Sequence, residues 1–393
     1  MFGLASWLVI SGCGESKSDA SEGGDESGGS GGASGAAGSD ASGGSGASGG
    51  TNPSGGTNPS GGTGATGGSG ATGGTSGSGG SPPSGDFPTG FGPPEAILTG
   101  LTFPVRLGIR DGYLYFTEMG LDDGSMSRLA RRSPSGEVET LFSGNRVAAM
   151  HLDAEALYFV ERGTNTVFRM NYETLEREVF TTTTMTVADV ETLDGRVWIT
   201  EYQSTPSSST SVTVYDTAGT VVAQPVPPLA TSQLFTYMTV GGGNVYIARL
   251  GSALFKVPPS GSGGVTVSNV QPAHLDADET HVYFTSQDGS VFRQLHTVVE
   301  QPEELATGQA VPFAVAVDGG GAYWTNGGTD CETTATGGSV YGVPLAGGAP
   351  VPVATGERCP QAITTDGEYV YWTREAVVAP ADDSIVRARK IHP

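Results

Sequence analysis

Residues 87–393 are predicted to form an all-β, seven-bladed β-propeller, because a short turn-and-strand motif recurs seven times within them. Its clearest copy is Asp366–Thr373, which reads Asp-Gly-Glu-Tyr-Val-Tyr-Trp-Thr. The central aromatic residues of the seven copies, spaced 37 to 48 residues apart, are Tyr115, Tyr158, Trp198, Tyr246, Tyr283, Tyr323 and Tyr371. A period in this range, with strand chemistry in each unit, is typical of propeller blades.

Each copy of the motif combines a turn signal with a buried strand. Asp-Gly favours a tight turn, because glycine adopts positive φ without steric cost and aspartate tolerates turns. The run Tyr369–Trp372 that follows is apolar at every position, not only at alternate positions. This pattern predicts a strand that is buried on both faces, as in a blade packed between two neighbours.

The sixth unit shows the four strands expected of a blade. We expect an inner strand A over Val311–Val317, strand B over Ala322–Asn326, strand C over Gly338–Pro344 and an outer strand D over Pro350–Ala354. The glycine-rich end of strand C is typical of a hairpin. Further C strands are expected at Thr166–Met170, Ser211–Tyr215, Ala253–Val257, Ser290–Leu295 and, last in the chain, Ser384–Lys390.

The seventh unit stops after its C strand and lacks an outer strand. A candidate lies at the other end of the domain, because Glu95–Gly100 resembles the outer-strand sequences Glu303–Gly308 and Pro352–Gly356. We therefore predict that Ala96–Thr99 lies alongside Ile385–Arg389. An N-terminal strand would then complete the C-terminal blade, close the ring and remove two free sheet edges.

The first residues resemble a bacterial lipoprotein signal. Met1–Ile10 is apolar and leads into Ile10-Ser11-Gly12-Cys13, which looks like a lipobox with lipidation at Cys13. Because no Lys or Arg precedes Cys13, either the true start lies upstream or the match is accidental and this is a disordered apolar terminus. The sequence contains no apolar run of about 18 residues, so no transmembrane helix is predicted.

Residues 14–86 are expected to be a disordered linker. They consist largely of Gly, Ser, Ala and Thr, with Thr-Asn-Pro-Ser-Gly-Gly in tandem from Thr51 and Thr57. Such a segment has almost no apolar surface to bury, so burial cannot offset the entropy lost on ordering. As a flexible coil it would span on the order of 45 Å, enough to hold a domain away from a membrane surface.

The chain carries a formal net charge of −22 at pH 7. A surface of this charge repels phosphate groups, which argues against nucleic acid and against direct binding to anionic lipid. It is compatible with cations, with basic partners or with solubility alone.

Apart from Cys13, the chain contains two cysteines, Cys331 and Cys359. Cys331 falls in the expected B–C loop of the sixth unit and Cys359 in the crossover to the seventh, and both segments emerge at the same rim of a propeller. In an oxidising compartment we expect a disulfide between them, worth roughly 3–4 kcal/mol if unstrained. Two free buried thiols are the alternative.

Ligand binding is expected at the rim that carries the B–C loops and the D–A crossovers. The side chains predicted at the ends of the B strands are Glu118, Glu161, Glu201, Arg249, Ser286, Asn326 and Arg374, and those on the crossovers are Arg146, Asp189, Tyr237, His274, Phe313 and Gln361. One interpretation is a polar funnel for a small ligand or peptide, with the three glutamates forming an acidic arc. The other is that strand ends are polar simply because they meet water.

Signals for a metal site are weak. Asp276, Asp278 and Glu279, and separately Asp122-Asp123-Gly124, offer oxygen atoms for a hard cation, but neither set matches a calcium loop. Zinc is disfavoured because the cysteines are few and no paired histidine spacing exists. No metal and no cofactor are predicted.

Catalytic signals are also weak, and no Gly-x-Ser-x-Gly nucleophile motif is present. His151 and His274 occupy similar His-Leu-Asp contexts on expected inner strands, close enough to the channel to act as general bases. Histidines in such positions are more often packed between blades. An enzyme with its site in the funnel therefore stays an alternative.

The units Tyr371–Arg374, Tyr323–Asn326 and Tyr115–Glu118 resemble the Tyr-Trp-Thr-Asp repeat of extracellular YWTD-type propellers. Ile385-Val386-Arg387 likewise resembles the Ile-x-Arg continuation of that family, and Val343–Gly348 is similar to repeats of DUF5050-like and TolB-like propellers of bacterial lipoproteins. The resemblance implies a propeller and leaves function open, because such propellers serve many roles.

Two features of this chain depart from the YWTD pattern. The aspartate that follows Trp-Thr is absent from every unit, so its hydrogen-bonding role is not carried over. There are also seven units, whereas YWTD domains have six.

Together these observations predict a lipid-anchored, extracytoplasmic propeller that acts as a non-catalytic binding or interaction module. The expected partner is an envelope protein, a peptide or a glycan, and the chain is expected to be a monomer that meets the membrane only through its lipid. Gly14 after Cys13 is not an aspartate-type inner-membrane retention signal, which favours the outer membrane. The alternatives are a funnel-site enzyme of lyase or lactonase type and a scaffold lipoprotein in outer-membrane assembly.

Overall fold

The computed structural model describes residues 85–120, 127–203, 209–230, 235–249, 252–297, 301–328, 337–375 and 383–392, with backbone alone for residues 227–230, 235 and 236. Within these ranges the chain forms strands and turns, and no helix there could span a membrane. The predicted lipidation site Cys13 and the predicted linker up to residue 84 lie outside the described residues.

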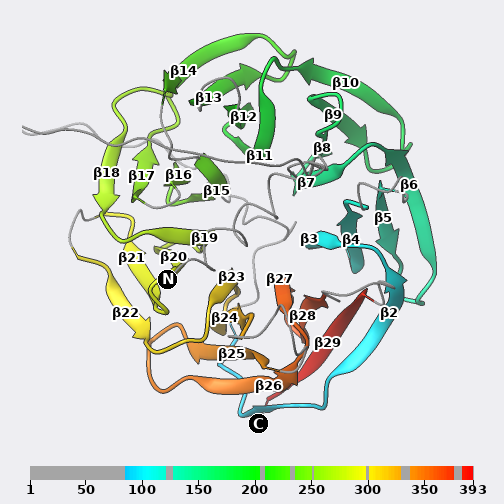
Figure 1. Cartoon of the computed structure of the whole chain (residues 1–393), viewed down its shortest axis with the longest axis vertical. Coiled ribbons are helices and arrows are strands. Elements are labelled where there is room, and N and C mark those ends of the chain that lie inside the picture. The colour runs from blue at the N-terminus through cyan, green and yellow to red at the C-terminus, as the bar shows by residue number, and fades with distance from the viewer. Residues whose placement is uncertain are drawn as a thin grey trace, which may run out of the picture. The chain divides into compact units, whose positions relative to one another are not determined.

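Seven sheets are arranged around a central axis as the blades of a β-propeller (Figure 1). In blades 1 to 6 the four strands are antiparallel and follow the sequence order from the centre of the ring to its outside. The predicted all-β, seven-bladed fold is therefore confirmed.

The strands of the blades have the following bounds. Blade 1 contains β3 (Pro104–Arg110), β4 (Tyr113–Glu118), β5 (Ser127–Arg132) and β6 (Val138–Gly144), and blade 2 contains β7 (Val147–Leu152), β8 (Ala156–Glu161), β9 (Thr166–Asn171) and β10 (Arg177–Thr182). Blade 3 contains β11 (Thr186–Leu193), β12 (Arg196–Gln203), β13 (Ser209–Asp216) and β14 (Val221–Ala230), and blade 4 contains β15 (Phe235–Gly241), β16 (Asn244–Arg249), β17 (Ala253–Val257) and β18 (Val265–Ser268). Blade 5 contains β19 (Pro272–Ala277), β20 (His281–Ser286), β21 (Val291–Leu295) and β22 (Glu303–Ala306), and blade 6 contains β23 (Pro312–Val317), β24 (Gly321–Asn326), β25 (Gly338–Pro344) and β26 (Val351–Glu357). Blade 7 contains β27 (Pro360–Thr365), β28 (Tyr369–Arg374) and β29 (Asp383–Ile391), together with β2 (Glu95–Leu101) and β1 (Gly90–Phe91).

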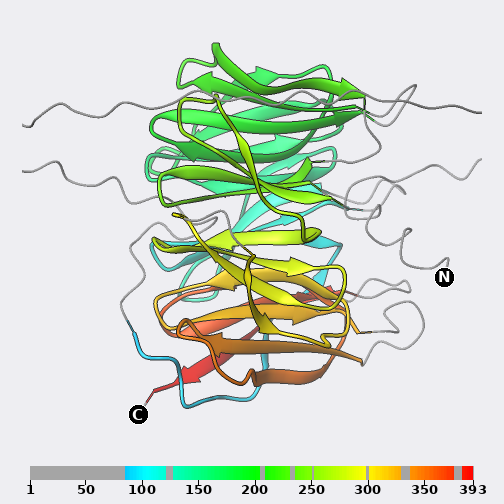
Figure 2. The same ribbon diagram turned by 90° about the vertical axis from the view of Figure 1, so that its left-hand side faces the viewer.

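The ring closes as predicted, because β2 pairs with β29 and becomes the outer strand of blade 7. Ala96 lies opposite Val386, and Leu98 lies opposite Ile385. The short strand β1, which the sequence analysis missed, pairs with the last residues of β29, so the described N-terminal segment lies beside the C-terminal end (Figure 2). Both ends of the propeller are thereby held in one sheet.

The second strand of each blade is buried, as its continuous apolar run predicts. Trp198, Trp324 and Trp372 are 0% exposed. Each packs between two neighbouring blades, so the core of the molecule is a ring of interblade layers and not one central cluster.

The aspartate of the turn motif holds the aromatic side chain that follows it. In blade 7, Asp366 accepts hydrogen bonds from the backbone N–H of Tyr369 (2.6 Å) and from the hydroxyl of Tyr371 (3.1 Å). In blade 5, Asp278 does the same for His281 (2.7 Å) and Tyr283 (2.8 Å). The same aspartate therefore stabilises the turn and fixes the position of the tyrosine side chain.

The threonine that ends the motif joins neighbouring blades. Thr325 accepts a hydrogen bond from the backbone N–H of Ala314 in its own blade (3.1 Å) and donates one to the carbonyl of Gln361 in blade 7 (2.7 Å). Thr285 likewise donates to the carbonyl of Phe313 in the next blade (2.8 Å). These two buried hydroxyls connect blade 6 to blade 7 and blade 5 to blade 6.

Candidate functional site

Every inner strand is irregular near its start, at the rim where ligand binding is predicted. The pairing with the second strand shifts between Pro104 and Arg106, Val147 and Met150, Val187 and Asp189, Phe235 and Tyr237, Pro272 and His274, Pro312 and Val315, and Pro360 and Ile363. A β-bulge bends its strand and changes the direction of a side chain. The repeated bulges therefore set the side chains at the mouth of the channel.

Four of these side chains meet across the mouth. The guanidinium of Arg106, from blade 1, lies 3.6 Å from the carboxylate of Asp189 in blade 3 and 4.8 Å from the centre of the Tyr237 ring in blade 4. The Tyr237 ring in turn lies 4.7 Å from the His274 ring of blade 5. The structure thus brings together three of the predicted crossover residues and adds Arg106.

Arg106 was missed in the sequence because blade 1 has no preceding crossover of the usual form. A signal was nevertheless present, since Pro104-Val-Arg106 corresponds to Pro272-Ala-His274 at the start of another inner strand. The side chain of Arg106 is 19% exposed and that of Asp189 is 8% exposed, so the pair is largely buried but still reached by solvent.

The surroundings of the cluster shift the pKa values of two of its groups. Burial, reinforced by the positive charge of Arg106, lowers the pKa of His274 to about 3. The Nδ1 atom of the neutral ring faces the backbone N–H of Val315 at 3.4 Å, so Nδ1 is the acceptor and the proton is on Nε2. Burial raises the pKa of Asp189, although Arg106 and the N–H of Met238 (2.9 Å) favour its charged form.

A side chain of blade 2 stabilises the inner strand that carries Asp189. Arg162 donates to the carbonyls of Val187 (3.1 Å) and Ala188 (3.2 Å), which form the bulge immediately before Asp189. Nearby, His151 lies 3.0 Å from Glu191, and both side chains are almost fully buried. His151 is therefore packed between blades 2 and 3. This position agrees with the interpretation that such a histidine is packed between blades, and not with a general base at the channel.

The three glutamates of the predicted acidic arc all accept hydrogen bonds from groups of the propeller. Glu118 accepts from Arg128 (2.6 and 2.8 Å), and Glu161 accepts from the N–H of Asn145 (2.7 Å). Glu201, only 7% exposed, accepts from the hydroxyls of Ser211 and Thr213, each at 3.1 Å. Each of the three therefore has partners within the propeller, and their part in an acidic ligand-binding arc stays a prediction.

The remaining predicted rim residues also make contacts within the propeller. Arg374 pairs with Glu357 (2.8 Å), Asn326 donates to Gln309 (2.9 Å), Arg249 lies over the Phe255 ring, Arg146 accepts at its carbonyl from the N–H of Arg162, Ser286 donates its N–H to the carbonyl of Ser290, and Phe313 lies against Gly327. These contacts position the rim and leave the cluster around Arg106 as its best-defined polar group.

Blade 7 adds a second polar group to the same rim. Gln361 donates through Nε2 to one oxygen of Glu375, a side chain that is 4% exposed. The other oxygen of Glu375 has no hydrogen-bond partner among the described residues. Burial raises the pKa of Glu375 well above its ordinary value, and the charge of Asp383 adds to this effect. Burial therefore favours the neutral form of this carboxyl group.

Two further predictions concern residues that the described structure covers in part. Cys359 is 1% exposed, but Cys331 lies outside the described residues, so the disulfide stays a prediction. Asp276 accepts from the backbone N–H groups of Val317 (2.7 Å) and Ala277 (2.8 Å), and Asp278 is used by its turn. No group of three potential metal-binding side chains occurs among the described residues.

Comparisons with known proteins agree with this fold and go no further. No family model and no curated protein sequence matches the chain. It is similar to the WD40 β-propeller domain of Doa1 (TM-score 0.55, 13% identity, 76% of this chain and 97% of that one) and to an oligogalacturonate lyase in complex with manganese (0.54, 14%, 71% and 86%). It also resembles acylaminoacyl peptidase from Pyrococcus horikoshii (0.53, 10%), covering 72% of this chain but only 51% of the peptidase. At such identities the likeness shows the propeller fold alone.

Proposed function

We propose that the chain is an extracytoplasmic binding module that takes a polar peptide segment at the mouth of its central channel. The observation that carries this proposal is the convergence of Arg106, Asp189, Tyr237 and His274 from four blades. These side chains stand on paired inner strands, so they are preorganised and little entropy is lost when a ligand binds.

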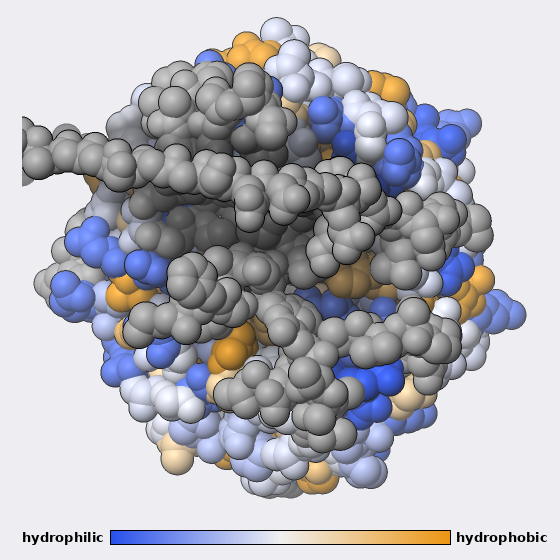
Figure 3. Space-filling view, viewed as in Figure 1, coloured by the Kyte–Doolittle hydropathy of each residue, from blue (hydrophilic) through white to orange (hydrophobic). Residues whose placement is uncertain are grey.

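The chemistry of the cluster suits a peptide better than a strongly charged ligand. Asp189 balances the charge of Arg106, and the neutral His274 offers an N–H donor. Peptide groups supply both donors and acceptors, whereas a phosphate would be repelled by the overall charge of −22. Around the edge of the face shown in Figure 3, the hydrophobic residues are scattered among hydrophilic ones.

A random peptide library selected against the full chain would test this proposal. Selected peptides should bind Arg106→Gln at least tenfold more weakly than the unaltered protein. Arg387→Gln is the matched control, because Arg387 pairs with Glu95 on the outer edge of blade 7, away from the mouth. Selected peptides that bind both variants as tightly as the unaltered chain would refute the mouth as the site.

Glu375 favours a second candidate, a funnel enzyme of lyase or lactonase type. A buried carboxyl group with a raised pKa is what general acid catalysis requires at neutral pH. His274 is poorly suited as a base, because its Nδ1 is an acceptor and its pKa is low. If the chain is such an enzyme, Glu375→Gln should abolish its turnover of uronate or lactone substrates, and the control Glu161→Gln should keep it. Absence of turnover by the unaltered chain would exclude this candidate.

We also propose that Cys13 is lipidated and tethers the propeller to the cell envelope. The lipobox-like sequence, the low-complexity segment after it and the resemblance to YWTD-type and TolB-like propellers support this proposal. Incorporation of a labelled fatty acid should be lost in Cys13→Ser. A scaffold role in outer-membrane assembly would instead be supported by crosslinking to a β-barrel complex. The predicted disulfide between Cys331 and Cys359 would be tested by the mass shift of the protein on reduction.

A further inference from the structure

Arg106 at the channel mouth has hydrogen-bond donors that no described residue accepts. Its side chain is 19% exposed, and the carboxylate oxygen of Asp189 lies 3.6 Å from its Nη2 atom, beyond hydrogen-bond distance. Within the described ranges its guanidinium group donates from Nη1 to the carbonyl of Val105, at 3.4 Å. A guanidinium group carries five N–H donors, so Arg106 keeps most of its donors for a ligand that reaches it from solvent.

The ring of Tyr237 holds Arg106 without using these donors. The carbon atom of the guanidinium group lies 4.8 Å from the centre of the ring. A cation over an aromatic face is attracted by the electrons of the ring and needs no hydrogen bond. The Nε and Nη2 atoms of Arg106 are therefore held in place at the mouth with no acceptor among the described residues.

Three of the other arginines that lie over aromatic rings show what completes such a group. They are Arg128 over Phe116 (5.8 Å), Arg131 over Tyr113 (4.8 Å) and Arg387 over Tyr369 (4.3 Å). In each case Nε and Nη2 both contact one carboxylate oxygen of a neighbouring strand at 2.6 to 3.1 Å, and these carboxylates belong to Glu118, Glu139 and Glu95. This edge of a guanidinium group matches a carboxylate in geometry. Arg106 has the ring and lacks the carboxylate.

Asp189 does not take that place, because the backbone of the next blade holds it. One of its oxygens accepts from the N–H of Met238 at 2.9 Å, and the other is the oxygen that lies 3.6 Å from Arg106. Asp189 therefore offsets the charge of Arg106 and leaves its Nε and Nη2 donors without a hydrogen bond.

Arg162 adds a second positive charge beside Asp189. It donates to the two carbonyls immediately before Asp189, at 3.1 and 3.2 Å. Burial lowers the pKa of Arg162, and the nearby charge of Arg106 lowers it further, so the two guanidinium groups repel each other. His151 and Glu191, the other titratable pair of this region, contact each other at 3.0 Å. Arg106, Arg162 and Asp189 together thus carry an excess of one positive charge.

The neutral ring of His274 supplies a further donor at the mouth. It lies 4.7 Å from the ring of Tyr237, and its Nδ1 atom accepts from Val315. The N–H at Nε2 has no acceptor among the described residues. The donors left over at the mouth, on Arg106 and His274, call for a ligand group that only accepts hydrogen bonds.

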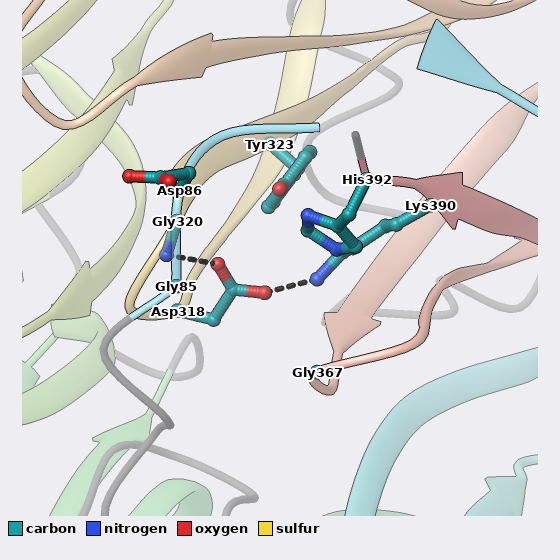
Figure 4. Close-up of a pocket in the computed structure, with 8 residues that line it drawn as sticks. All are labelled: Gly85, Asp86, Asp318, Gly320, Tyr323, Gly367, Lys390 and His392. Atoms are coloured by element: carbon teal, nitrogen blue, oxygen red, sulfur yellow. Dashed lines mark hydrogen bonds and ion pairs between the residues drawn. The ribbon is translucent and has the colours of Figure 1, made fainter. Parts of the chain in front are cut away.

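The buried lysine of blade 7 shows the opposite case. Lys390 donates to the carboxylate of Asp318, to the hydroxyl of Thr365 (2.7 Å) and to the carbonyl of Asp366. In Figure 4 its ammonium group points to Asp318 at the edge of a cavity between blades 6 and 7. An ammonium group has three donors, so Lys390 has none left for a ligand.

We infer that the channel mouth recognises a carboxylate group of its peptide ligand, either a free C-terminus or an acidic side chain. This inference rests on the peptide site proposed above. The carboxylate would accept from Nε and Nη2 of Arg106, as Glu95 does from Arg387, and from the Nε2–H of His274. Its single negative charge matches the excess of one positive charge. A peptide carbonyl would leave that charge unbalanced, and a phosphate group would bring about two negative charges.

The test exposes the full chain to three sets of short N-acetylated peptides made of random uncharged residues. The first set ends in a free carboxylate, the second ends in an amide, and the third ends in an amide and contains one aspartate. Bound peptides are identified by mass spectrometry, and calorimetry compares each with its counterpart in which the carboxylate and the amide are exchanged. The amide form should bind at least about tenfold more weakly, because hydrogen bonds to charged groups contribute more than neutral ones.

The source of the carboxylate follows from the set that is recovered. Peptides recovered mainly from the first set would assign the site to a C-terminus, and peptides mainly from the third would assign it to an acidic side chain. Arg106→Gln should remove the preference for the carboxylate. Arg387→Gln is the matched control and should keep it, because Arg387 lies over a tyrosine ring at the outer edge of blade 7 with Glu95 as its partner.

Two results would overturn the inference and leave the peptide site standing. The first is equal binding of carboxylate and amide forms to the unaltered chain, a comparison that needs no variant. The second is a preference for the carboxylate that Arg106→Gln keeps in full while binding peptides more weakly. Recovery of no peptide from any of the three sets would instead overturn the peptide site and this inference together.

Discussion

Replacing Thr325 with valine should destabilise the propeller by about 2–4 kcal/mol. The substitution keeps the shape of a side chain that is 0% exposed, and it removes only the hydroxyl. That hydroxyl accepts from the N–H of Ala314 at 3.1 Å and donates to the carbonyl of Gln361 at 2.7 Å. Each of these partners would lose its hydrogen bond, and a buried group left without one costs about 1–3 kcal/mol. The bond to the Gln361 carbonyl is only partly buried, so its loss is expected to cost about 1 kcal/mol, at the lower end of this range.

Thermal and urea unfolding of the full chain would measure this cost. A change of 1 kcal/mol shifts the melting temperature by about 2–4 °C in domains of 150–250 residues, so a fall of roughly 4–16 °C is expected here. The urea midpoint should fall without a change in slope, because the surface exposed on unfolding stays the same.

Thr200→Val is the matched control. Thr200 occupies the same position in the motif of blade 3 and is also 0% exposed, but its hydroxyl has no hydrogen-bond partner among the described residues. Its replacement should change stability by less than about 0.5 kcal/mol or should stabilise the protein. Equal losses in the two variants would refute the idea that the blade-to-blade hydrogen bonds of Thr325 are what the motif's threonine supplies.

Two further outcomes follow from ring closure and from the buried histidine. Deleting residues 85–101 should expose Ile385 and Val386, both 0% exposed, and should lower the free energy of unfolding by at least about 3–6 kcal/mol. The free edge of β29 should also cause the chains to associate. A monomer in light scattering with an unchanged unfolding midpoint would contradict this prediction. The folded-state pKa of His274, about 3, lies below its ordinary value of 6.5, so its contribution to stability is present above about pH 6.5 and is lost as the pH falls from there towards 3. The stability difference between the unaltered chain and His274→Asn should therefore shrink between pH 7.5 and pH 4.5 in urea unfolding, and a difference that stays constant would show that His274 titrates normally.

The sequence by itself determined the blades and the way the ring closes. Both are written in local chemistry, because an Asp-Gly turn followed by a continuous apolar run has few alternatives to a strand that is buried on both faces. Closure could be predicted because residues 95–100 repeat an outer-strand pattern that the last blade lacks, and the pairing of Leu98 with Ile385 confirms it. The short strand β1 has no such repeat to mark it, and it was missed.

Only the tertiary structure decided which polar side chains meet. Arg106 contacts Asp189 and Tyr237 because bulges turn inner strands of separate blades towards one channel, and no spacing along the chain encodes that meeting. Glu118 was predicted from the sequence to face a ligand at the rim. In the structure its carboxylate instead accepts from Arg128 on the adjacent strand. In the same way, Lys390 takes the carboxylate of Asp318, 72 residues earlier, and leaves Tyr323 without the partner that its repeat supplies elsewhere. The physical reason is that strand formation depends on neighbours in sequence, whereas polar pairing depends on neighbours in space.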